Sequence, residues 1–309
     1  MLRLEGINKS FGARQVLKGV TFEVDDGRIT GFVGGNGAGK TTTMRIVLGL
    51  LKANSGSVTW DGAPITNDMA RRAGYMPEER GLYPRMTVLD QLVYLARLHG
   101  LTQDKARSNA WDLLERLELK ARAKDKVETL SLGNQQRAQV AAALVHSPDL
   151  LILDEPFSGL DPLAVDAVTV VLREFAARGV PILFSSHQLD LVERVTDDLV
   201  IIAGGEIKAT GSREKLQQAH TGERHFLQAQ GDLSWVERQA GIGQAMSEKG
   251  KVTFDASDAD AQQVLRQALD RGPVDGFGRR RPTLAEVFRE VIRDEEPGEE
   301  AHAGQGVAA

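Results

Sequence analysis

The sequence predicts an α/β protein with a parallel sheet at its core and a small α+β domain after it. Three observations indicate this class. Short apolar runs, such as "LLILDEP" at 150–156 and "VPILFSSH" at 180–187, end in polar residues, as buried parallel strands often do. Helical patterns alternate with such runs, which is typical of a parallel sheet covered by helices. After about residue 218 the segments become shorter, which indicates a second domain.

The elements can be justified in chain order. The first thirty residues alternate apolar and polar positions, which predicts antiparallel strands around the turn at Asp25–Gly27. A buried strand, "RITGFVG", then leads into glycines and a helix with apolar residues at helical spacing. Residues 94–119 are mostly helical with a break near Gly100, and "LVIIAGGEIKATG" predicts a hairpin over Gly204 and Gly205. The parallel core therefore carries an antiparallel subdomain and a helical subdomain at about 80–147.

The last part of the chain predicts a small α+β domain at 222–293, after a first domain at 1–218. Strands are expected at 224–231, 251–256 and 274–280, and helices at 234–240, 258–271 and 283–292. Ser234 with Glu237 and Thr283 with Glu286 have the spacing of capping boxes, which would begin two of these helices. Residues 294–309 carry five acids and no Lys or Arg, which predicts a disordered acidic tail.

Composition excludes several classes of function. The formal net charge is -5, and the acidic tail accounts for all of it, so general affinity for nucleic acid is not expected. The chain has 0 cysteines, which excludes disulfides, thiol catalysis and cysteine metal sites. No signal-peptide pattern is present, and no apolar run approaches the ~20 residues that span a bilayer. A membrane role would therefore require a partner.

A phosphate-binding loop is the strongest motif. "GGNGAGKTT" at 34–42 fits G-x-x-x-x-G-K-[ST] through Gly34, Gly39, Lys40 and Thr41, between a buried strand and a helix. Glycines let backbone N–H groups turn toward phosphate oxygens, and the start of the helix adds positive potential. Lys40 should reach the β- and γ-phosphates, and Thr41 should bind Mg²⁺. We therefore expect a nucleoside triphosphate site.

Two further strand ends supply acid–base groups. "LLILDEP" ends in Asp154, which should hold the Mg²⁺ shell, and in Glu155, which can orient or deprotonate the attacking water. His187 ends the strand "VPILFSSH" and can donate to the γ-phosphate. Strand ends in an open α/β sheet share one edge, so these groups should meet the phosphate loop.

Taken together, the motifs resemble the ATPase subunits of ATP-binding-cassette (ABC) transporters. The resemblance covers about residues 1–218 and includes the phosphate loop, the signature "LSLGNQQR" at 130–137, "LLILDEP", "SGLD" at 158–161 and His187, in family order. "GYMPEERGLYP" at 74–84 and the ending "RPTLAEVFREVI" at 281–292 resemble the bacterial sodium-extrusion and drug-export subgroup. The resemblance implies Glu155, His187, Lys40 and Glu78 as catalytic residues, and Thr41, Asp154 and Glu78 as Mg²⁺ ligands. It implies these ATP-binding residues: Phe11 (on adenine), Gly34, Asn36, Gly37, Ala38, Gly39, Lys40, Thr41, Thr42, Ser131, Gly133, Asn134 and Asp161.

The chain departs from the family pattern at four positions. Gly35 stands where proline is common, Leu132 replaces the first signature glycine, and Asn134 replaces the usual glutamine. Glu78 stands where a glutamine usually contacts Mg²⁺ and the attacking water. A carboxylate can still bind Mg²⁺, but it adds negative charge beside the triphosphate. We therefore expect ATP binding to depend more strongly on Mg²⁺.

The resemblance also implies partners and a location. Two subunits, expected to be copies of this chain, would hold two ATPs, with the phosphate loop of one facing Ser131 and Gly133 of the other. A separate permease would dock on the segment after Glu78, around Tyr83 and Met86 and toward Leu98. The subunit would thus lie at the cytoplasmic face of the cell membrane, in an exporter rather than an importer.

Two other hypotheses remain at this point. The first is a soluble mechanical ATPase acting in translation or DNA maintenance. The single phosphate loop, the lack of cysteine zinc modules and the short distance from phosphate loop to signature argue against it. The second is a nucleotide-binding regulator without hydrolysis. Glu155 and His187 argue against that one, because a binder needs neither.

Overall fold

The computed structural model describes residues 1–79, 81–248 and 250–293, and the chain divides into two compact units. The larger unit contains residues 1–213 and the described residues from Val291 on, and the smaller unit contains Glu214–Glu290. The predicted acidic tail lies outside the described residues. The two units meet between Arg213 and Glu214, a few residues before the expected boundaries at 218 and 222, which stay a prediction.

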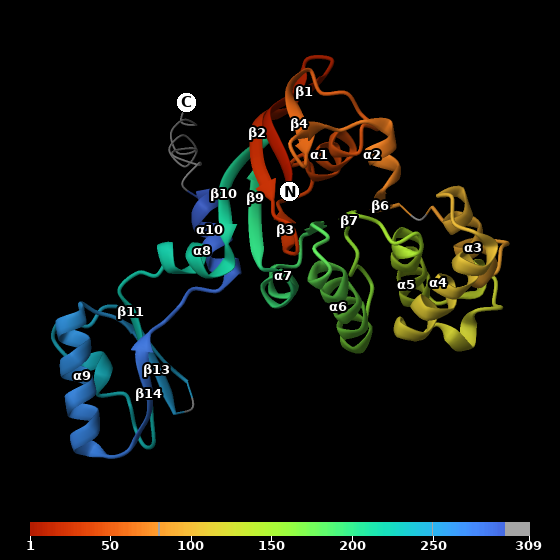
Figure 1. Ribbon diagram of the computed structural model, residues 1–309. Helices are drawn as coiled ribbons and strands as arrows, with labels where there is room; N and C mark the ends of the chain where they lie inside the picture. The colour runs from red at the N-terminus through yellow and green to blue at the C-terminus, as the bar shows by residue number, and fades with distance from the viewer. Residues whose placement is uncertain (80, 249, 294–309) are drawn as a thin grey trace, which may run out of the picture. The chain divides into compact units, whose positions relative to one another are not determined.

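A six-stranded sheet forms the centre of the larger unit, with the strand order β10-β9-β3-β8-β7-β6 (Figure 1). Neighbours from β9 to β6 run parallel, and β10 pairs antiparallel to β9. The predicted α/β class is therefore confirmed. The strands β3, β7 and β8 are buried at every residue, because helices cover both faces of such a sheet. The strands are β3 Ile29–Val33, β6 Ala73–Met76, β7 Leu150–Asp154, β8 Ile182–Ser186, β9 Asp198–Ala203 and β10 Glu206–Ser212.

A second, antiparallel sheet has the order β2-β1-β4-β5, and Figure 1 shows β1 and β4 beside the helix α1 (Lys40–Val47). Leu2, Leu4 and Phe22 alternate with exposed residues and join one apolar core with Phe32 and Met44. The first two strands agree with the predicted alternation, whereas the last two were not predicted. The strands are β1 Leu2–Phe11, β2 Arg14–Val24, β4 Ser55–Trp60 and β5 Ala63–Pro64.

Three helices of the larger unit form a helical group beside the sheet. The helices α3, α4 and α5 pack against one another, and α5 also contacts β6, which attaches this helical group to the sheet. The break predicted near Gly100 falls between α3 and α4. The helices are α1 Lys40–Val47, α2 Asn67–Arg71, α3 Val88–Leu98, α4 Gln103–Arg116, α5 Leu132–Leu144, α6 Pro162–Ala177 and α7 Leu189–Val195, with 3-10 turns at Lys120–Arg122 and Val127–Thr129.

The smaller unit is a four-stranded antiparallel sheet of order β12-β13-β11-β14 with the helix α9 packed against it. Leu227, Val252 and Phe254 point to the buried side with Ala261 and Val264 of α9. This arrangement is the expected α+β type. The elements are β11 Arg224–Ala229, β12 Ala245–Glu248, β13 Lys251–Asp255, α9 Asp258–Arg271 and β14 Val274–Arg279, with α8 Arg213–Ala219 before them and α10 Leu284–Arg293 after them.

One predicted helix is wrong. Residues 234–240 contain only a 3-10 turn at Val236–Arg238. Ser234 does not begin a helix. Its backbone N–H, which Glu237 would accept from in a capping box, donates instead to the Asp232 carboxylate at 2.8 Å, and its hydroxyl donates to the same carboxylate at 2.9 Å. The other capping box is present. The Thr283 N–H donates to Glu286 at 2.9 Å, and the Glu286 N–H donates to the Thr283 hydroxyl at 3.3 Å.

Candidate functional site

The phosphate loop joins β3 to α1, and close packing determines its glycines. A Cβ on Gly34 would lie 2.4 Å from the Ile202 carbonyl oxygen, so no larger residue fits there without a shift of the backbone. Gly39 has a φ of +111°, a left-handed conformation that favours glycine, and it precedes the first helical residue. Lys40 is 8% exposed, and its Nζ donates to the Gly34 and Gly35 carbonyls at 2.7 and 3.2 Å. The loop therefore curls around the lysine that should meet phosphates.

Asp154 lies buried at the end of β7, beside the start of α1. The Thr41 hydroxyl donates to its Oδ2 at 2.7 Å. The Ser185 hydroxyl donates to its other oxygen, because β7 and β8 pair in a register that places Asp154 opposite Ser185. The two predicted Mg²⁺ ligands Thr41 and Asp154 are thus in direct contact, and a buried serine from the neighbouring strand orients the carboxylate.

Glu155 has an unusual backbone conformation with a φ of +53°, which costs on the order of 1 kcal/mol or more in a residue other than glycine. Two buried side chains hold it. Its N–H donates to the Ser185 hydroxyl at 2.9 Å, and Gln136 Nε2 donates to its carbonyl at 2.8 Å. Strain that is held in this way is common at functional sites.

The Glu155 carboxylate pairs with His187, whose Nδ1 lies 2.8 Å from Oε1. Burial raises the pKa of Glu155 above its ordinary value, while the His187 bond and charge and the Lys40 charge lower it again in part. A raised pKa makes this carboxylate a better proton acceptor than an exposed glutamate. The Glu155 side chain is 11% exposed and that of His187 is 54% exposed, so the pair opens toward solvent on the histidine side.

One cavity of about 750 Å³ gathers most of the predicted site residues. The structure adds two lining residues that no motif indicated, Arg14 and Val16 of β2. Arg14 extends toward the phosphate loop, since its Nη2 lies 3.9 Å from the position that a Cβ on Gly37 would take. The only sequence signal for Arg14 is its place just after Phe11. The predicted residues that line the cavity are Asn36, Gly37, Gly39, Lys40, Thr41, Thr42, Glu78, Asp154, Glu155 and His187.

Other predicted residues lie outside this lining, namely Phe11, Gly34, Ala38, Ser131, Gly133, Asn134 and Asp161. Phe11 ends β1 with its ring 51% exposed and the Lys9 ammonium 5.0 Å from the ring centre. Asp161 caps α6 by accepting from the Ala164 N–H at 2.9 Å. Ala38 is buried, and Gly34 contacts Lys40 through its carbonyl. Their roles toward ATP stay predictions.

The signature residues begin α5. Ser131 is the N-cap, and its Oγ accepts from the Asn134 N–H at 3.4 Å, so the hydroxyl hydrogen can still donate to another group. The Asn134 side chain accepts from Arg137 at 2.5 Å. Gly133 faces the loop before α6, because a Cβ there would lie 3.4 Å from the Gly159 carbonyl. Ser131 and Leu132 are exposed, so this helix start is accessible to a partner.

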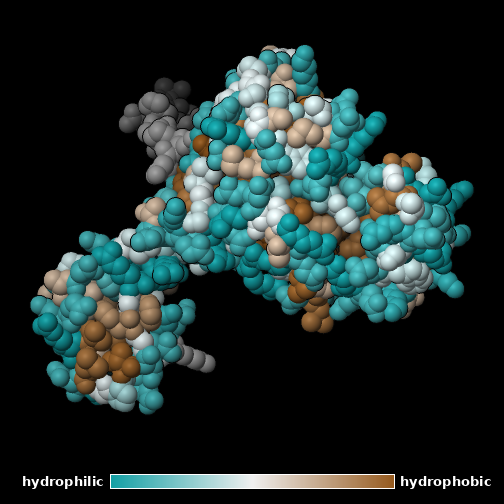
Figure 2. Space-filling view, in the orientation of Figure 1, coloured by the Kyte–Doolittle hydropathy of each residue, from teal (hydrophilic) through white to brown (hydrophobic). Residues whose placement is uncertain are grey.

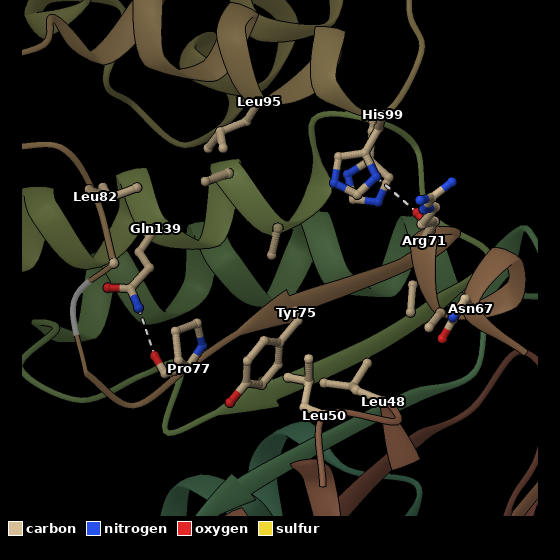
Figure 3. Close-up of a pocket in the computed structure, with 16 residues that line it drawn as sticks. Leu48, Leu50, Asn67, Arg71, Tyr75, Pro77, Leu82, Leu95, His99 and Gln139 are labelled. Carbon is tan, nitrogen blue, oxygen red and sulfur yellow. Dashed lines mark hydrogen bonds between the residues drawn. The ribbon is translucent and has the colours of Figure 1, made fainter. Parts of the chain in front are cut away.

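A second hollow, which we call the apolar groove, has a volume of about 470 Å³ and lies between the sheet and the helical group (Figure 3). Figure 3 shows Leu82 and Leu95 on one side and Tyr75, Leu48 and Leu50 on the other, with the polar residues Asn67, Arg71 and His99 toward one end. Brown side chains also gather at the surface over the helical group in Figure 2. Exposed Tyr83 and Tyr94 form an edge-to-face pair nearby, with ring centres 6.1 Å apart.

Mg²⁺ fits the donor atoms of the cavity. Thr41 and Asp154 offer adjacent oxygens, and Glu78 adds a carboxylate to the same lining. Mg²⁺ prefers oxygen ligands and is usually bound by few protein groups together with water and substrate phosphates. Within residues 1–79, 81–248 and 250–293, no group of three or more histidine or acidic side chains could hold a metal alone. With Mg²⁺ bound, Thr41, Asp154 and Glu78 would supply protein oxygens, and phosphates and water the remaining ones.

Comparisons with known proteins agree with this nucleotide site. Residues 17–158 match the family model described as ABC transporter, and residues 211–292 match the model of the ATP-binding protein DrrA1-3-like C-terminal domain. The uncharacterized ABC transporter ATP-binding protein YhaQ of Bacillus subtilis (strain 168) is 36% identical over 293 residues, which is 94% of this chain and 98% of that protein. Nod factor export ATP-binding protein I of Burkholderia pseudomallei (strain 1710b) is 37% identical over 70% of this chain and 72% of its own. A solved ATP-binding subunit of an ABC transporter has a TM-score of 0.66 and 32% identity, over 71% of this chain and 92% of that one.

These findings define a phosphate-loop nucleotide-binding protein with a cassette fold. The chain belongs to the ATP-binding subunits of ABC transporters. It is therefore an ATPase subunit of a transporter, and the hypothesis of a soluble mechanical ATPase is not supported. No helix in the described part of the chain is both long and apolar enough to cross a membrane.

Proposed function

We propose that the chain works as one of two identical ATPase subunits that drive a separate membrane permease, and that the transport is export. The observation that carries the hydrolytic part is the meeting of Thr41, Asp154, Glu155 and His187 in one cavity beside the phosphate loop. The similar protein from Burkholderia pseudomallei is a Nod factor export ATP-binding protein, which supports the direction of transport.

The chemistry is transfer of the terminal phosphoryl group to water, by positioning and charge neutralisation. Lys40 neutralises charge on the phosphates, and Glu155 accepts the proton of the attacking water. His187 orients the Glu155 carboxylate through its 2.8 Å contact and presents its other ring nitrogen to the γ-phosphate. Mg²⁺, held by Thr41, Asp154 and Glu78 when bound, supplies further charge neutralisation. Phe11 stacks on the adenine ring.

Exposed signature residues support a dimer. Ser131 and Gly133 do not line the cavity of their own subunit, and Ser131 has a hydroxyl hydrogen available at an exposed helix start. The start of a helix favours an anion. We therefore propose that Ser131 and Gly133 complete the ATP site of a second copy. Four further residues would hold the phosphate loop and the signature in place without lining the cavity, namely Gly34, Ala38, Asn134 and Asp161.

The apolar groove is where the permease should dock. Its apolar walls suit a short amphipathic helix from the cytoplasmic side of a membrane protein, and the polar residues at one end provide hydrogen bonds for the end of such a helix. The exposed residues Tyr83, Tyr94 and Leu98 extend this contact area. Docking there would place the subunit on the cytoplasmic face of the membrane.

The test compares the wild-type chain with Glu155→Gln. Glutamine has nearly the same shape and can keep the contact with His187, but it is not a base. We expect kcat for ATP hydrolysis to fall by at least about a hundredfold with little change in ATP affinity. The variant should accumulate as an ATP-bound dimer in size-exclusion chromatography, and affinity-tagged chain should co-purify from membranes with a multi-helix permease.

Each part of the proposal can fail separately. Near-normal phosphate release by the variant would remove Glu155 from catalysis. A variant that stays monomeric in ATP would contradict the dimer. A wild-type chain found entirely in the soluble fraction, with ribosomes or DNA, would contradict the permease partner.

A further inference from the structure

Gln139 connects the signature helix to the segment that carries Glu78. It lies on α5, is 3% exposed, and borders the apolar groove (Figure 3). Its Nε2 donates to the Pro77 carbonyl at 2.7 Å and to the Glu79 carbonyl at 3.3 Å. Only the amide nitrogen can face two carbonyl oxygens, because carbonyls accept and do not donate. The side chain therefore bridges the main chain on both sides of Glu78.

The same helix holds the second catalytic segment in the same manner. Gln136, one turn earlier on α5, is 6% exposed and donates from Nε2 to the Glu155 carbonyl at 2.8 Å. Two buried amides at (i, i+3) spacing thus bond the backbone at both carboxylates that should surround the terminal phosphate. The helix that begins at Ser131 is tied to both places.

Glu78 depends on its main chain for its position. Its side chain is exposed at the cavity edge, and among the described residues no hydrogen bond or ion pair fixes its carboxylate. A carboxylate at this edge raises the free energy of bound ATP unless Mg²⁺ is present, and that effect weakens with distance. The location of the backbone at 77–79 therefore controls how strongly ATP binding depends on Mg²⁺.

We propose that Gln139 is a positioning residue for ATP hydrolysis, which fixes the main chain on both sides of Glu78 and so places the Glu78 carboxylate beside the Mg²⁺ site. This inference rests on the proposed role of Glu78 as a residue of that site. It does not require Gln139 to contact the nucleotide, and Gln139 is absent from the cavity lining.

The experiment measures ATP affinity of the full chain in Mg²⁺ and in EDTA, for wild type, Glu78→Gln, Gln139→Leu and the double variant. The readout is the dissociation constant in EDTA divided by the dissociation constant in Mg²⁺, so a larger ratio means a stronger dependence on Mg²⁺. Leucine has a similar volume and also removes the buried Gln139 Oε1, which has no partner among the described residues, so unfolding is not expected. Asn109→Leu is the matched control, because Asn109 Nδ2 also donates to a main-chain carbonyl, that of Val145, at 2.9 Å, and Asn109 lies outside both the signature and the cavity lining.

We expect Glu78→Gln to lower the ratio, and Gln139→Leu to lower it in the same direction by about fivefold, the effect of one lost hydrogen bond. In the Glu78→Gln background, Gln139→Leu should add no further change, since the two residues act together. Asn109→Leu should leave the ratio at the wild-type value. Thermal melting of each variant separates these effects from loss of folding.

Three results would overturn the inference, in distinguishable ways. If Glu78→Gln lowers the ratio while Gln139→Leu matches Asn109→Leu, Glu78 keeps its proposed role and Gln139 does not position it. The same conclusion about Gln139 follows if Gln139→Leu lowers the ratio as much in the Glu78→Gln background as in wild type. If Glu78→Gln leaves the ratio unchanged, the role of Glu78 at the Mg²⁺ site is wrong, and the inference about Gln139 fails with it.

Discussion

Ser185 is the residue through which the structure makes its sharpest prediction. Its hydroxyl donates to the Asp154 carboxylate and accepts from the Glu155 N–H, and the residue is 0% exposed. Ser185→Ala removes both bonds and leaves a buried N–H without its partner. A hydrogen bond to a charged group contributes about 1.5–3 kcal/mol, and a buried unpaired donor costs about 1–3 kcal/mol. Because the two effects share one hydroxyl, we expect a total loss of about 3 kcal/mol of unfolding free energy.

The catalytic effect should exceed what the lost stability explains. Asp154 and Glu155 would both lose an orienting contact, and a misplacement of about 1 Å can lower a rate by about a hundredfold. We expect kcat to fall by about ten- to a hundredfold at a temperature where the variant is folded.

Ser186→Ala is the matched control for this variant. Ser186 is buried in the same strand, and among the described residues its hydroxyl accepts only from the Gln188 N–H, at 3.0 Å. Ser186→Ala should lower the free energy of unfolding by about 1 kcal/mol and change kcat only slightly. Urea unfolding and a steady-state phosphate assay measure both quantities. If the two variants behave alike, the argument that Ser185 orients the acidic pair is refuted.

Two further predictions concern the cavity. The pKa of Glu155 is raised by burial and partly lowered by His187, so the base is lost when pH falls through a value above the ordinary 4.5. His187→Ala removes the lowering partner and should move the acid limb of the kcat/KM profile to higher pH, and a limb at lower pH or unmoved would contradict this. Arg14→Gln should weaken ATP affinity by about tenfold, most strongly at low salt, because a guanidinium beside the phosphate loop can pair with phosphate. Arg3→Gln, a variant in an Arg paired with Glu5 and Glu23 away from the lining, should leave ATP affinity unchanged in the same titration.

The sequence was sufficient for the α/β class and for the residues that belong to motifs, since glycine spacing and apolar strands ending in acids have direct physical meanings. It was insufficient for Ser185, Gln136, Gln139 and Arg14, which are ordinary polar residues in their own segments. Ser185 reaches Asp154 only because β8 pairs with β7 in parallel with Asp154 opposite Ser185, and no local pattern specifies that register. The sequence signal was limited to an apolar run, "ILFSS", that ends in two serines.

The smaller unit shows where local rules are outweighed. Ser234 and Glu237 have the same spacing as Thr283 and Glu286, and only the second pair begins a helix. The difference lies two residues earlier, where the Asp232 carboxylate accepts from the Ser234 N–H that would bond Glu237 in a capping box. A capping pattern therefore predicts a helix only when no nearby carboxylate competes for that N–H.

The groups expected to bind ATP and Mg²⁺ already bond one another. Lys40 bonds the carbonyls of its own loop, Thr41 bonds Asp154, and Glu155 contacts His187. A nucleotide must therefore exchange these bonds for its own, so the free energy of binding is a difference between two sets of similar contacts. Any bond exchanged in this way makes the net free energy of binding smaller than that of the new contacts alone. An ATPase subunit that releases its product in every cycle gains more from such reversible binding than from tight binding.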